Sequence, residues 1–264
     1  MTSSELVKLK AAPFKTNWLV RLTWLAGAVY LVYAIGYLDI SLPRVFAGLG
    51  NGAKFLGEMV PPDYSRWKLL ISNLIETVEI AVIASAFGVL FSLPIGLCAA
   101  RNLMPVWLTW IARFFIMVCR SFHPVIFAIL FVKAVGFGPL AGILTLIFAS
   151  IGFIGKLFAE AIEEISDKPI EALRASGAPF MSVILMAVLP QVLNRFIGFA
   201  TYQFDANLRN STMVGIVGAG GIGGTLFASF QRFDYDFLAA ILISIIMLVM
   251  LSELISVQIK KVFQ

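Results

Sequence analysis

A short run of acidic, small and basic residues, followed at a fixed distance by Leu-Pro, is well suited to contact another protein. It comprises Glu171, Ala172, Arg174, Gly177, Leu189 and Pro190. Gly177 favours a helix end and proline favours a helix start, so the spacing predicts two short helices joined by a turn. Small residues permit close approach to a groove on a partner, and the Glu171 carboxylate can pair with a basic group there. The alternative is a solvated amphipathic loop whose glycine only ends a helix.

A second polar cluster follows an apolar stretch and consists of Arg209, Asn210, Ser211 and Thr212. An arginine can bind an oxyanion through two N–H groups of its planar fork, and neighbouring amide and hydroxyl groups can add hydrogen bonds. Asp205 lies one helical turn before Arg209 and offers another interpretation, an internal ion pair. Both interpretations remain open from the sequence, since each could hold in a different state of a working cycle.

Other kinds of chemistry find little support in the sequence. His123 is the only histidine, which excludes a metal site built from histidines. Five acidic residues of one segment could suggest a carboxylate metal site, but they better suit a wet cytoplasmic helix face; they are Glu160, Glu163, Glu164, Asp167 and Glu171. Gly155-Lys156 is followed by leucine and preceded by no glycine-rich loop, so this chain cannot bind ATP through a phosphate loop. A paired nucleophile and base are also missing, so an intramembrane enzyme is not favoured.

The composition indicates the environment in which these residues must be held. The chain has 264 residues, of which 60% are hydrophobic and 13% charged, and its mean hydropathy is +0.93. A soluble core of this size cannot hide so much apolar surface, whereas a bilayer can accept it. The net charge of +5 comes from scattered bases without a basic stripe, which argues against nucleic acid. Cys98 and Cys119 are too few for a disulfide framework and are expected to be small buried residues.

Apolar stretches of about 20 residues, the length of a membrane span, predict an all-α polytopic membrane protein with about six transmembrane helices. The spans cover 18–37, 69–99, 106–134, 140–158, 188–208 and 237–257. The third has a polar break at 120–124, so it is either one kinked helix or a helix with a partly unwound middle. An amphipathic helix at 42–60 is expected on the membrane surface. We therefore divide the chain into 1–68, with the tail, the first span and the external amphipathic segment, and 69–264, the main membrane domain.

The basic residues predict the orientation of the spans. Lysines near the N-terminus, Arg101 between spans two and three, and the C-terminal Lys260-Lys261 all lie in the cytoplasm if both termini are inside. This arrangement follows the positive-inside rule. The segment 160–190 is then a cytoplasmic loop, and the glycine-rich segment 215–224 is external.

The external segment contains Gly218, Gly220, Gly221 and Gly223. As a string it matches the dinucleotide fingerprint, which requires a preceding strand in a soluble crossover unit. Here the string follows a membrane span, so the nucleotide interpretation fails. We expect a tight, flexible external loop that serves as a gate or as a docking surface for a binding protein.

The Glu171 segment resembles the cytoplasmic EAA loop of ABC importer permeases, which has Glu, small residues, Gly at the seventh position and a hydrophobic-x-Leu-Pro ending. Leu173 and Ala187 depart from the usual residues, which affects side-chain packing rather than register. Further segments look like phosphonate-type permeases; they are 61–64, 76–77, 131–139, 156–163, 204–212 and 217–223. The glycine block is partly shared with methionine-type permeases. From about residue 61 onward the chain is similar to the phosphonate, phosphite and phosphate branch.

The resemblance implies a type I ABC importer permease fold in the bacterial inner membrane, with Glu171–Gly177 passing ATPase movement to the spans. It implies a permease homodimer, two cytoplasmic ABC ATPase subunits that bind ATP and Mg, and a periplasmic substrate-binding protein. This chain would be a transport subunit without enzymatic activity, cofactor or metal, and residues 209–212 would line the pathway of a phosphonate-like oxyanion. The alternatives are a methionine-type or other small-solute ABC permease and a self-sufficient secondary transporter, for which an internal repeat would be expected.

Overall fold

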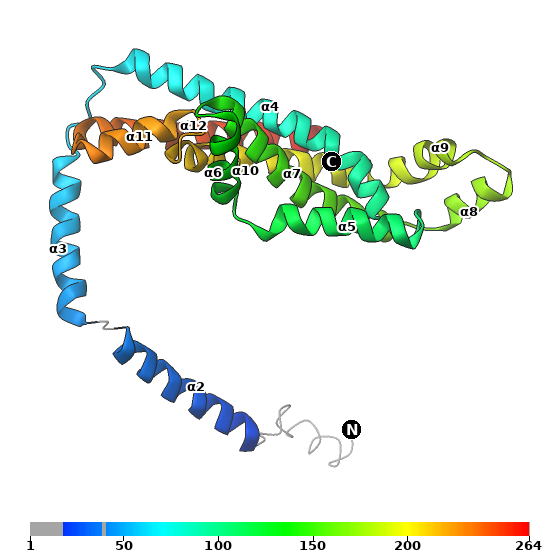
Figure 1. The fold of residues 1–264 in the computed structure, drawn as a ribbon, viewed down its shortest axis with the longest axis horizontal. Coiled ribbons are helices and arrows are strands. Elements are labelled where there is room, and N and C mark those ends of the chain that lie inside the picture. The colour runs from blue at the N-terminus through cyan, green and yellow to red at the C-terminus, as the bar shows by residue number, and fades with distance from the viewer. Residues whose placement is uncertain (1–17, 39–40, 264) are drawn as a thin grey trace, which may run out of the picture. The chain divides into compact units, whose positions relative to one another are not determined.

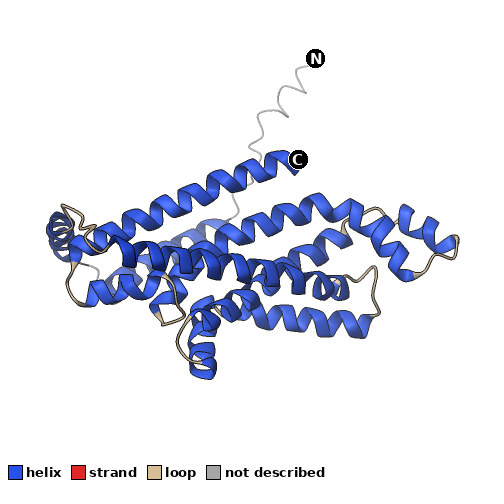
Figure 2. Cartoon of the chain, turned by 90° about the horizontal axis from the view of Figure 1, so that it is seen from above, coloured by secondary structure: helices blue, strands red, loops and turns tan. Residues whose placement is uncertain are grey.

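The computed structural model describes residues 18–38 and 41–263, and every regular element in this part of the chain is a helix (Figure 2). Packing divides the chain into two compact units, one ending at Gly57 and one beginning at Glu58. The division that we expect after residue 68 lies further along the chain and stays a prediction. The N-terminal tail, residues 1–17, lies outside the described residues.

The first unit contains helices α2 (Trp18–Tyr37) and α3 (Leu42–Glu58). Helix α2 is 20 residues long, is predominantly apolar on every side and buries none of its residues in protein. A helix of this kind is stable in lipid, which confirms the predicted first span. Helix α3 separates apolar from polar residues on opposite faces, as expected for a helix on a membrane surface.

Helices α4 (Trp67–Ala99) and α7 (Pro139–Glu163) form the most extensive helix pair of the second unit. A glycine allows the two backbones to approach closely, as in other membrane helix pairs. A Cβ atom added at Gly88 of α4 would overlap the Cβ atom of Ser150 in α7. These helices confirm spans two and four, each with a few residues added at its ends.

The third predicted span is broken into α5 (Val106–Ser121) and α6 (Pro124–Val135), which meet at an angle of 93°. In Figure 1, α6 runs across the direction of α5. Phe122 and His123 between them are extended, and the residue before a proline is sterically driven out of the helical region. The proline then begins α6, where its missing N–H costs nothing. The polar break at 120–124 is therefore a sharp bend between two helices.

The chain then turns back through a helical hairpin. Its elements are α8 (Lys168–Ala175), α9 (Phe180–Val183), the π-helical turn η1 (Ile184–Val188) and α10 (Leu189–Ile216). The sequence places the start of span five near 188, but the apolar span runs without interruption from Phe180 to Ile216. Helix α10 does begin at Leu189, close to the predicted start, but the helical turns of α9 and η1 extend the span backward to Phe180. In a regular α-helix the Pro190 ring would clash with the carbonyl of residue 186. The wider π-helical turn η1, just before α10, makes room for this ring.

Helices α11 (Ile222–Gln231) and α12 (Tyr235–Phe263) complete the second unit. Helix α11 was not predicted, and Gly223, which we assigned to the external loop, lies within it. Five described helices are long and apolar enough to cross a membrane, and the bent α5–α6 pair raises the number to six. The predicted count of about six is confirmed.

Candidate functional site

The segment Lys168–Val188, here called the α8–α9 hairpin, projects beyond the ends of α7 and α10 (Figure 1). Its turn is made by Gly177, whose φ of +76° is disfavoured for any residue with a side chain. The Gly177 N–H donates to the Arg174 carbonyl at 3.0 Å, and the Ala178 N–H donates to the Leu173 carbonyl at 3.1 Å. This is the Schellman pattern of helix termination. The predicted helix end at Gly177 is therefore observed.

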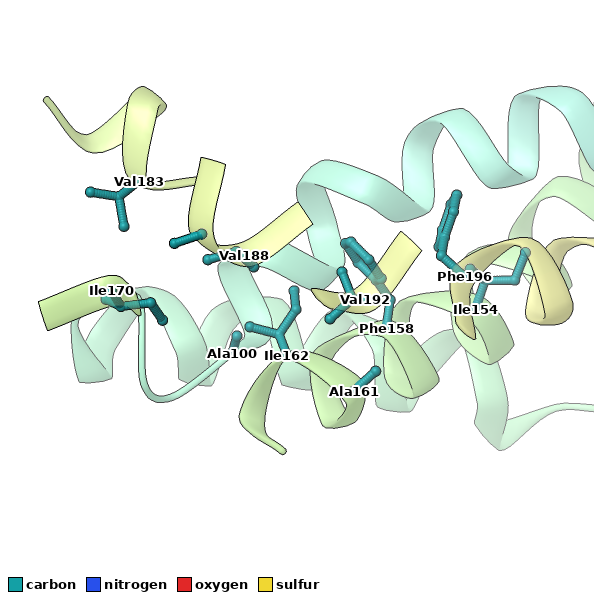
Figure 3. Packing of buried hydrophobic residues seen from close by; sticks show 11 residues of the cluster. Ala100, Ile154, Phe158, Ala161, Ile162, Ile170, Val183, Val188, Val192 and Phe196 are labelled. Atoms are coloured by element: carbon teal, nitrogen blue, oxygen red, sulfur yellow. The ribbon is translucent and has the colours of Figure 1, made fainter. Parts of the chain in front are cut away.

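The hairpin is held on one side by an apolar cluster. Ile170 of α8 is 3% exposed and Val183 of α9 is 1% exposed. Figure 3 shows them in the same cluster as Phe158 and Ile162 near the end of α7. Full burial of two aliphatic side chains stabilises the docked hairpin by about 1.5–3 kcal/mol each. The hairpin is therefore seated on the membrane helices rather than hanging from flexible connections.

The opposite side of the hairpin is open. Glu171, Ala172 and Arg174 are all exposed, and Pro190 at the start of α10 is exposed as well. In the described part of the chain, Glu171 and Arg174 make no ion pair. The hairpin thus combines a packed apolar root with a free polar face of both charges. Such a face can seat against another protein and pass a displacement directly to α7 and α10.

Ion pairs connect the root of the hairpin to neighbouring helices. A guanidinium N–H of Arg113 in α5 donates to Glu163 Oε1 at 2.6 Å, and Arg195 of α10 pairs with Glu164 at 2.6 Å. Each partly exposed pair contributes about 0.2–1 kcal/mol. Glu164 is exposed, as expected for a wet helix face, whereas Glu163 is half-buried. The basic partners of both carboxylates, far away in the sequence, were not predicted.

A reciprocal amide contact adds to this connection. The Gln191 Oε1 atom accepts from the Ser166 N–H at 3.2 Å, and Gln191 Nε2 donates to the Ser166 carbonyl at 3.4 Å and to the Ala187 carbonyl at 2.7 Å. The residues before and after the hairpin are thereby joined. No pattern in the sequence indicates this pairing.

The second predicted cluster is divided by the structure. Arg209 is exposed, whereas Ser211 is completely buried and its hydroxyl donates to the Leu208 carbonyl of the same helix at 2.7 Å. Asn210 and Thr212 are half-buried. Only Arg209 of the four therefore presents its side chain fully at the surface of α10.

The alternative that Arg209 pairs with Asp205 is wrong. Asp205 is 8% exposed, and its Oδ1 atom accepts from the Ser252 hydroxyl at 3.2 Å and from the Ser256 hydroxyl at 2.8 Å, both in α12. Within residues 18–38 and 41–263, Arg209 makes no ion pair. Helix α12 occupies the side of α10 on which Asp205 lies, so the carboxylate binds α12 instead of the arginine.

A buried polar cluster escaped the sequence analysis. The Asn207 Nδ2 atom donates to the Ser85 and Ser150 hydroxyls, both at 2.9 Å, and Gln203 Nε2 donates to Asn207 Oδ1 at 2.9 Å. All four residues are buried, and they join α4, α7 and α10. Hydrogen bonds of this kind hold membrane helices together. The i,i+4 spacing of Gln203 and Asn207 was the available signal.

The glycine-rich segment is packed against α4 and the start of α7. Its residues Gly218, Gly220 and Gly221 have φ of +89°, +82° and +76°, conformations that glycine adopts readily. Ala219 between them is completely buried, and the Gly138 N–H donates to the Gly218 carbonyl at 3.0 Å. The tight turn is as predicted, but the loop is held by packing and hydrogen bonds instead of being flexible.

Two residues of α4 cap the first residues of α11. Glu76 Oε1 accepts from the Gly221 N–H at 3.0 Å, and Thr77 Oγ1 accepts from the Ile222 N–H at 2.8 Å. These bonds satisfy donors that a helix start leaves without partners. The sequence analysis did not foresee this capping role of Glu76, because it did not predict α11.

The segment before α4 is tied to the start of α12. Arg66 pairs with Asp234 at 2.5 Å, and the Asp63 N–H donates to the Asp236 carbonyl at 3.0 Å. The Asp63 carboxylate accepts from the Ser65 N–H and hydroxyl, both at 2.8 Å. The backbone bond first and the hydroxyl bond second lower the pKa of Asp63 below its ordinary value of 3.8.

Comparison with known proteins assigns the fold. The phosphite transport system permease protein PtxC of Stutzerimonas stutzeri is 42% identical to this chain over 240 residues, which cover 90% of this chain and 86% of that protein. The phosphate-import permease protein PhnE of Mycolicibacterium smegmatis is 43% identical over 227 residues, which cover 85% of this chain and 43% of that longer protein.

A solved structure of the inward-facing MetNI methionine ABC transporter matches with a TM-score of 0.67 at 25% identity, over 76% of this chain and 99% of that chain. The fold is that of a type I ABC importer permease, as the sequence predicted. The family model of the binding-protein-dependent transport system inner membrane component matches residues 92–264. The chain belongs to this family of binding-protein-dependent transport system inner membrane components.

Proposed function

We propose that this chain is the transmembrane permease subunit of an ATP-driven importer that carries phosphonate, phosphite or phosphate across the inner membrane. The family supports a transport role, and two relatives above 40% identity are named for phosphite and phosphate transport. The match to the methionine transporter is lower in identity and covers less of this chain. It therefore supports the shared fold more than a shared cargo.

The α8–α9 hairpin carries this proposal. It has an apolar root on α7 and α10 and an exposed face with Glu171 and Arg174. We place this face against a cytoplasmic ATPase subunit, with Glu171, Ala172, Arg174, Gly177, Leu189 and Pro190 forming or supporting the contact. ATP and Mg would bind to that partner. The hairpin would then pass the closing movement of the ATPase to the two helices in which it is rooted.

The remaining parts of the assembly follow the same proposal. Two copies of the permease enclose one pathway about a two-fold axis. Both chain termini and the hairpin lie in the cytoplasm, and the glycine-rich turn with Gly218, Gly220 and Gly221 faces a periplasmic substrate-binding protein. Arg209 lies on the pathway near its outer end. Selection among oxyanions would rest largely with the binding protein.

The test is uptake of radiolabelled phosphite by cells that express the permease with its ATPase and binding protein. Gly177→Glu should abolish uptake while the protein remains inserted, because a side chain at φ +76° distorts the turn. Gly177→Asn is the matched control, since asparagine tolerates this conformation. Full uptake with Gly177→Glu would refute the assigned role of the hairpin. Uptake of methionine instead of phosphite would favour the second candidate, a methionine-type permease.

A further inference from the structure

A cavity of about 350 Å³ lies between α5 and α7, toward the end of the second unit that carries the hairpin. Its walls are partly aromatic and aliphatic, with Trp110 and Met117 among them. Cations are unusually frequent in the lining; they are Arg101, Arg113, Arg120 and Lys156. We call this site the Arg120 cavity. A cavity with basic groups and apolar walls suits a small anion that must lose part of its water.

Some of the cations that line the cavity have a carboxylate partner and others do not. Arg113 pairs with Glu163 at 2.6 Å, and Lys156 pairs with Glu160 at 3.3 Å. In the described part of the chain, Arg120 makes neither an ion pair nor a hydrogen bond with a carboxylate. Arg120 is also exposed in the isolated chain. Arg101 likewise makes no ion pair among the described residues, so the cavity keeps uncompensated positive charge both at Arg120, far from the hairpin, and at Arg101.

Arg120 lies deep in the membrane. It is near the end of α5, about 21 Å from the first residue of that helix at 1.5 Å per residue. A Cβ atom added at Gly152, near the middle of α7, would lie 2.8 Å from Arg120 Cγ, so the arginine stem rests against the middle of that helix. Helix α7 is long and apolar enough to span a hydrocarbon core of about 30 Å, so the residues that contact its middle lie near the middle of that core.

A cation at such a depth faces water or protein rather than lipid. The end of α5 offers Arg120 some compensation, because a positive charge is favourable in the last turn of a helix. That interaction is weak compared with the cost of placing an arginine in hydrocarbon. The face of α5 and α7 that carries Arg120 must therefore border an aqueous space or another polypeptide.

We propose that the Arg120 cavity is an anion-binding step of the translocation pathway and takes a tetrahedral phosphorus oxyanion near the middle of the membrane. This inference rests on the proposed function and adds to it a second cationic station, separate from Arg209. The guanidinium group of Arg120 binds two oxygens of the oxyanion, and the Lys156 ammonium provides a further charge. The apolar walls strengthen both interactions because they lower the local dielectric constant.

The paired cations give the anion a route onward. Lys156 and Arg113 lie progressively nearer the hairpin end of the cavity, and each already pairs with a glutamate. Sites that bind an ion too strongly stop its passage, and weak sites in series allow it to leave. Arg120 thus captures the anion, and Lys156 and Arg113, each with a glutamate partner, release it toward the cytoplasm.

The test uses a cysteine reporter in the wall of the cavity. Met117→Cys is introduced into full-length permease in which Cys98 and Cys119 are alanine, co-expressed with its ATPase in inside-out membrane vesicles. An anionic methanethiosulfonate should label this cysteine on the order of tenfold faster than a cationic one, because a cationic cleft concentrates anions. Arg120→Gln should remove this preference. Arg232→Gln, which changes an exposed arginine at the end of α11, should leave it unchanged.

A second reporter tests the position of water. Val118→Cys is next to Met117 and lies at nearly the same depth. Because it is two residues before Arg120, it lies on nearly the opposite face of α5 from Arg120. It should resist labelling. If Met117→Cys also resists every water-soluble reagent, or shows no preference for the anion, the proposal is overturned.

Protection experiments in nanodiscs distinguish free phosphite from a lipid headgroup as the anion that occupies the cavity. Inorganic phosphite should slow labelling of Met117→Cys in phosphatidylcholine alone. Protection that appears only with phosphatidylglycerol, and not with phosphite, would make the cavity a lipid headgroup site and overturn the proposal. Phosphite uptake by the unmodified complex is measured in parallel. Uptake without anion-selective labelling refutes the Arg120 cavity alone, whereas anion-selective labelling without uptake refutes the assigned cargo and leaves the cavity supported.

Discussion

Shortening Ile170 to alanine should release the α8–α9 hairpin from its seat. Ile170 is 3% exposed and packs in the cluster that contains Phe158, Ile162 and Val183. Removing buried aliphatic carbons from a well-packed site costs about 2–5 kcal/mol. Because this cluster lies at the end of the helices and can partly collapse, we take the lower end, about 2 kcal/mol. That value raises the population of undocked hairpin about thirtyfold.

Hydrogen–deuterium exchange of the α8 amides measures this effect directly, since those amides exchange through local opening of the hairpin. Ile170→Ala should speed their exchange by about that factor, and Ile170→Val, which costs about 0.5–1.5 kcal/mol, should fall between it and the unchanged protein. Leu185→Ala is the matched control, because Leu185 belongs to the same hairpin and is 54% exposed. Equal exchange in Ile170→Ala and Leu185→Ala would refute the view that the apolar cluster seats the hairpin.

The same variant has a functional consequence. In the complex, the partner ATPase should still hydrolyse ATP, but with a loosely held hairpin the permease should transport less phosphite for each ATP consumed. The measured quantity is the ratio of phosphite uptake to ATP hydrolysis in proteoliposomes. An unchanged ratio, together with faster exchange, would mean that docking of the hairpin is not needed for coupling.

Three further variants test the packing of the second unit, each measured in detergent. Asn207→Leu leaves buried hydroxyls without their partner and should destabilise the fold by about 1–3 kcal/mol, seen as a lower thermal transition. Gly88→Val should cost about 1–3 kcal/mol or more because its Cβ atom overlaps Ser150, whereas Gly198→Ala meets open space and should be neutral. Thr77→Val removes the acceptor for the first amide of α11 and should cost about 1 kcal/mol, seen as faster proteolysis near that helix. Unaltered transitions in Asn207→Leu or Gly88→Val, or an unaltered cleavage pattern in Thr77→Val, would contradict the corresponding contact.

Features with a local cause could be predicted from the sequence. Length and apolarity define α2 without any contact to other helices, because lipid replaces protein as its surroundings. The bend near 120–124 follows from Pro124, which restricts the residue before it and begins a new helix. The end of α8 at Gly177 follows from the ease with which glycine adopts a positive φ. Each of these signals acts within a few residues of the chain.

Features that depend on distant partners required the tertiary structure. Helix α11 begins where Glu76 and Thr77 of α4 meet its first amides, 145 residues away in sequence. Asp205 turns to α12 instead of Arg209, because packing decides which side of α10 each neighbour occupies. The cations of the Arg120 cavity are likewise gathered from separate helices. A sequence records residue type and local spacing, but the choice of partner across a bundle is made by whole helices burying their faces together.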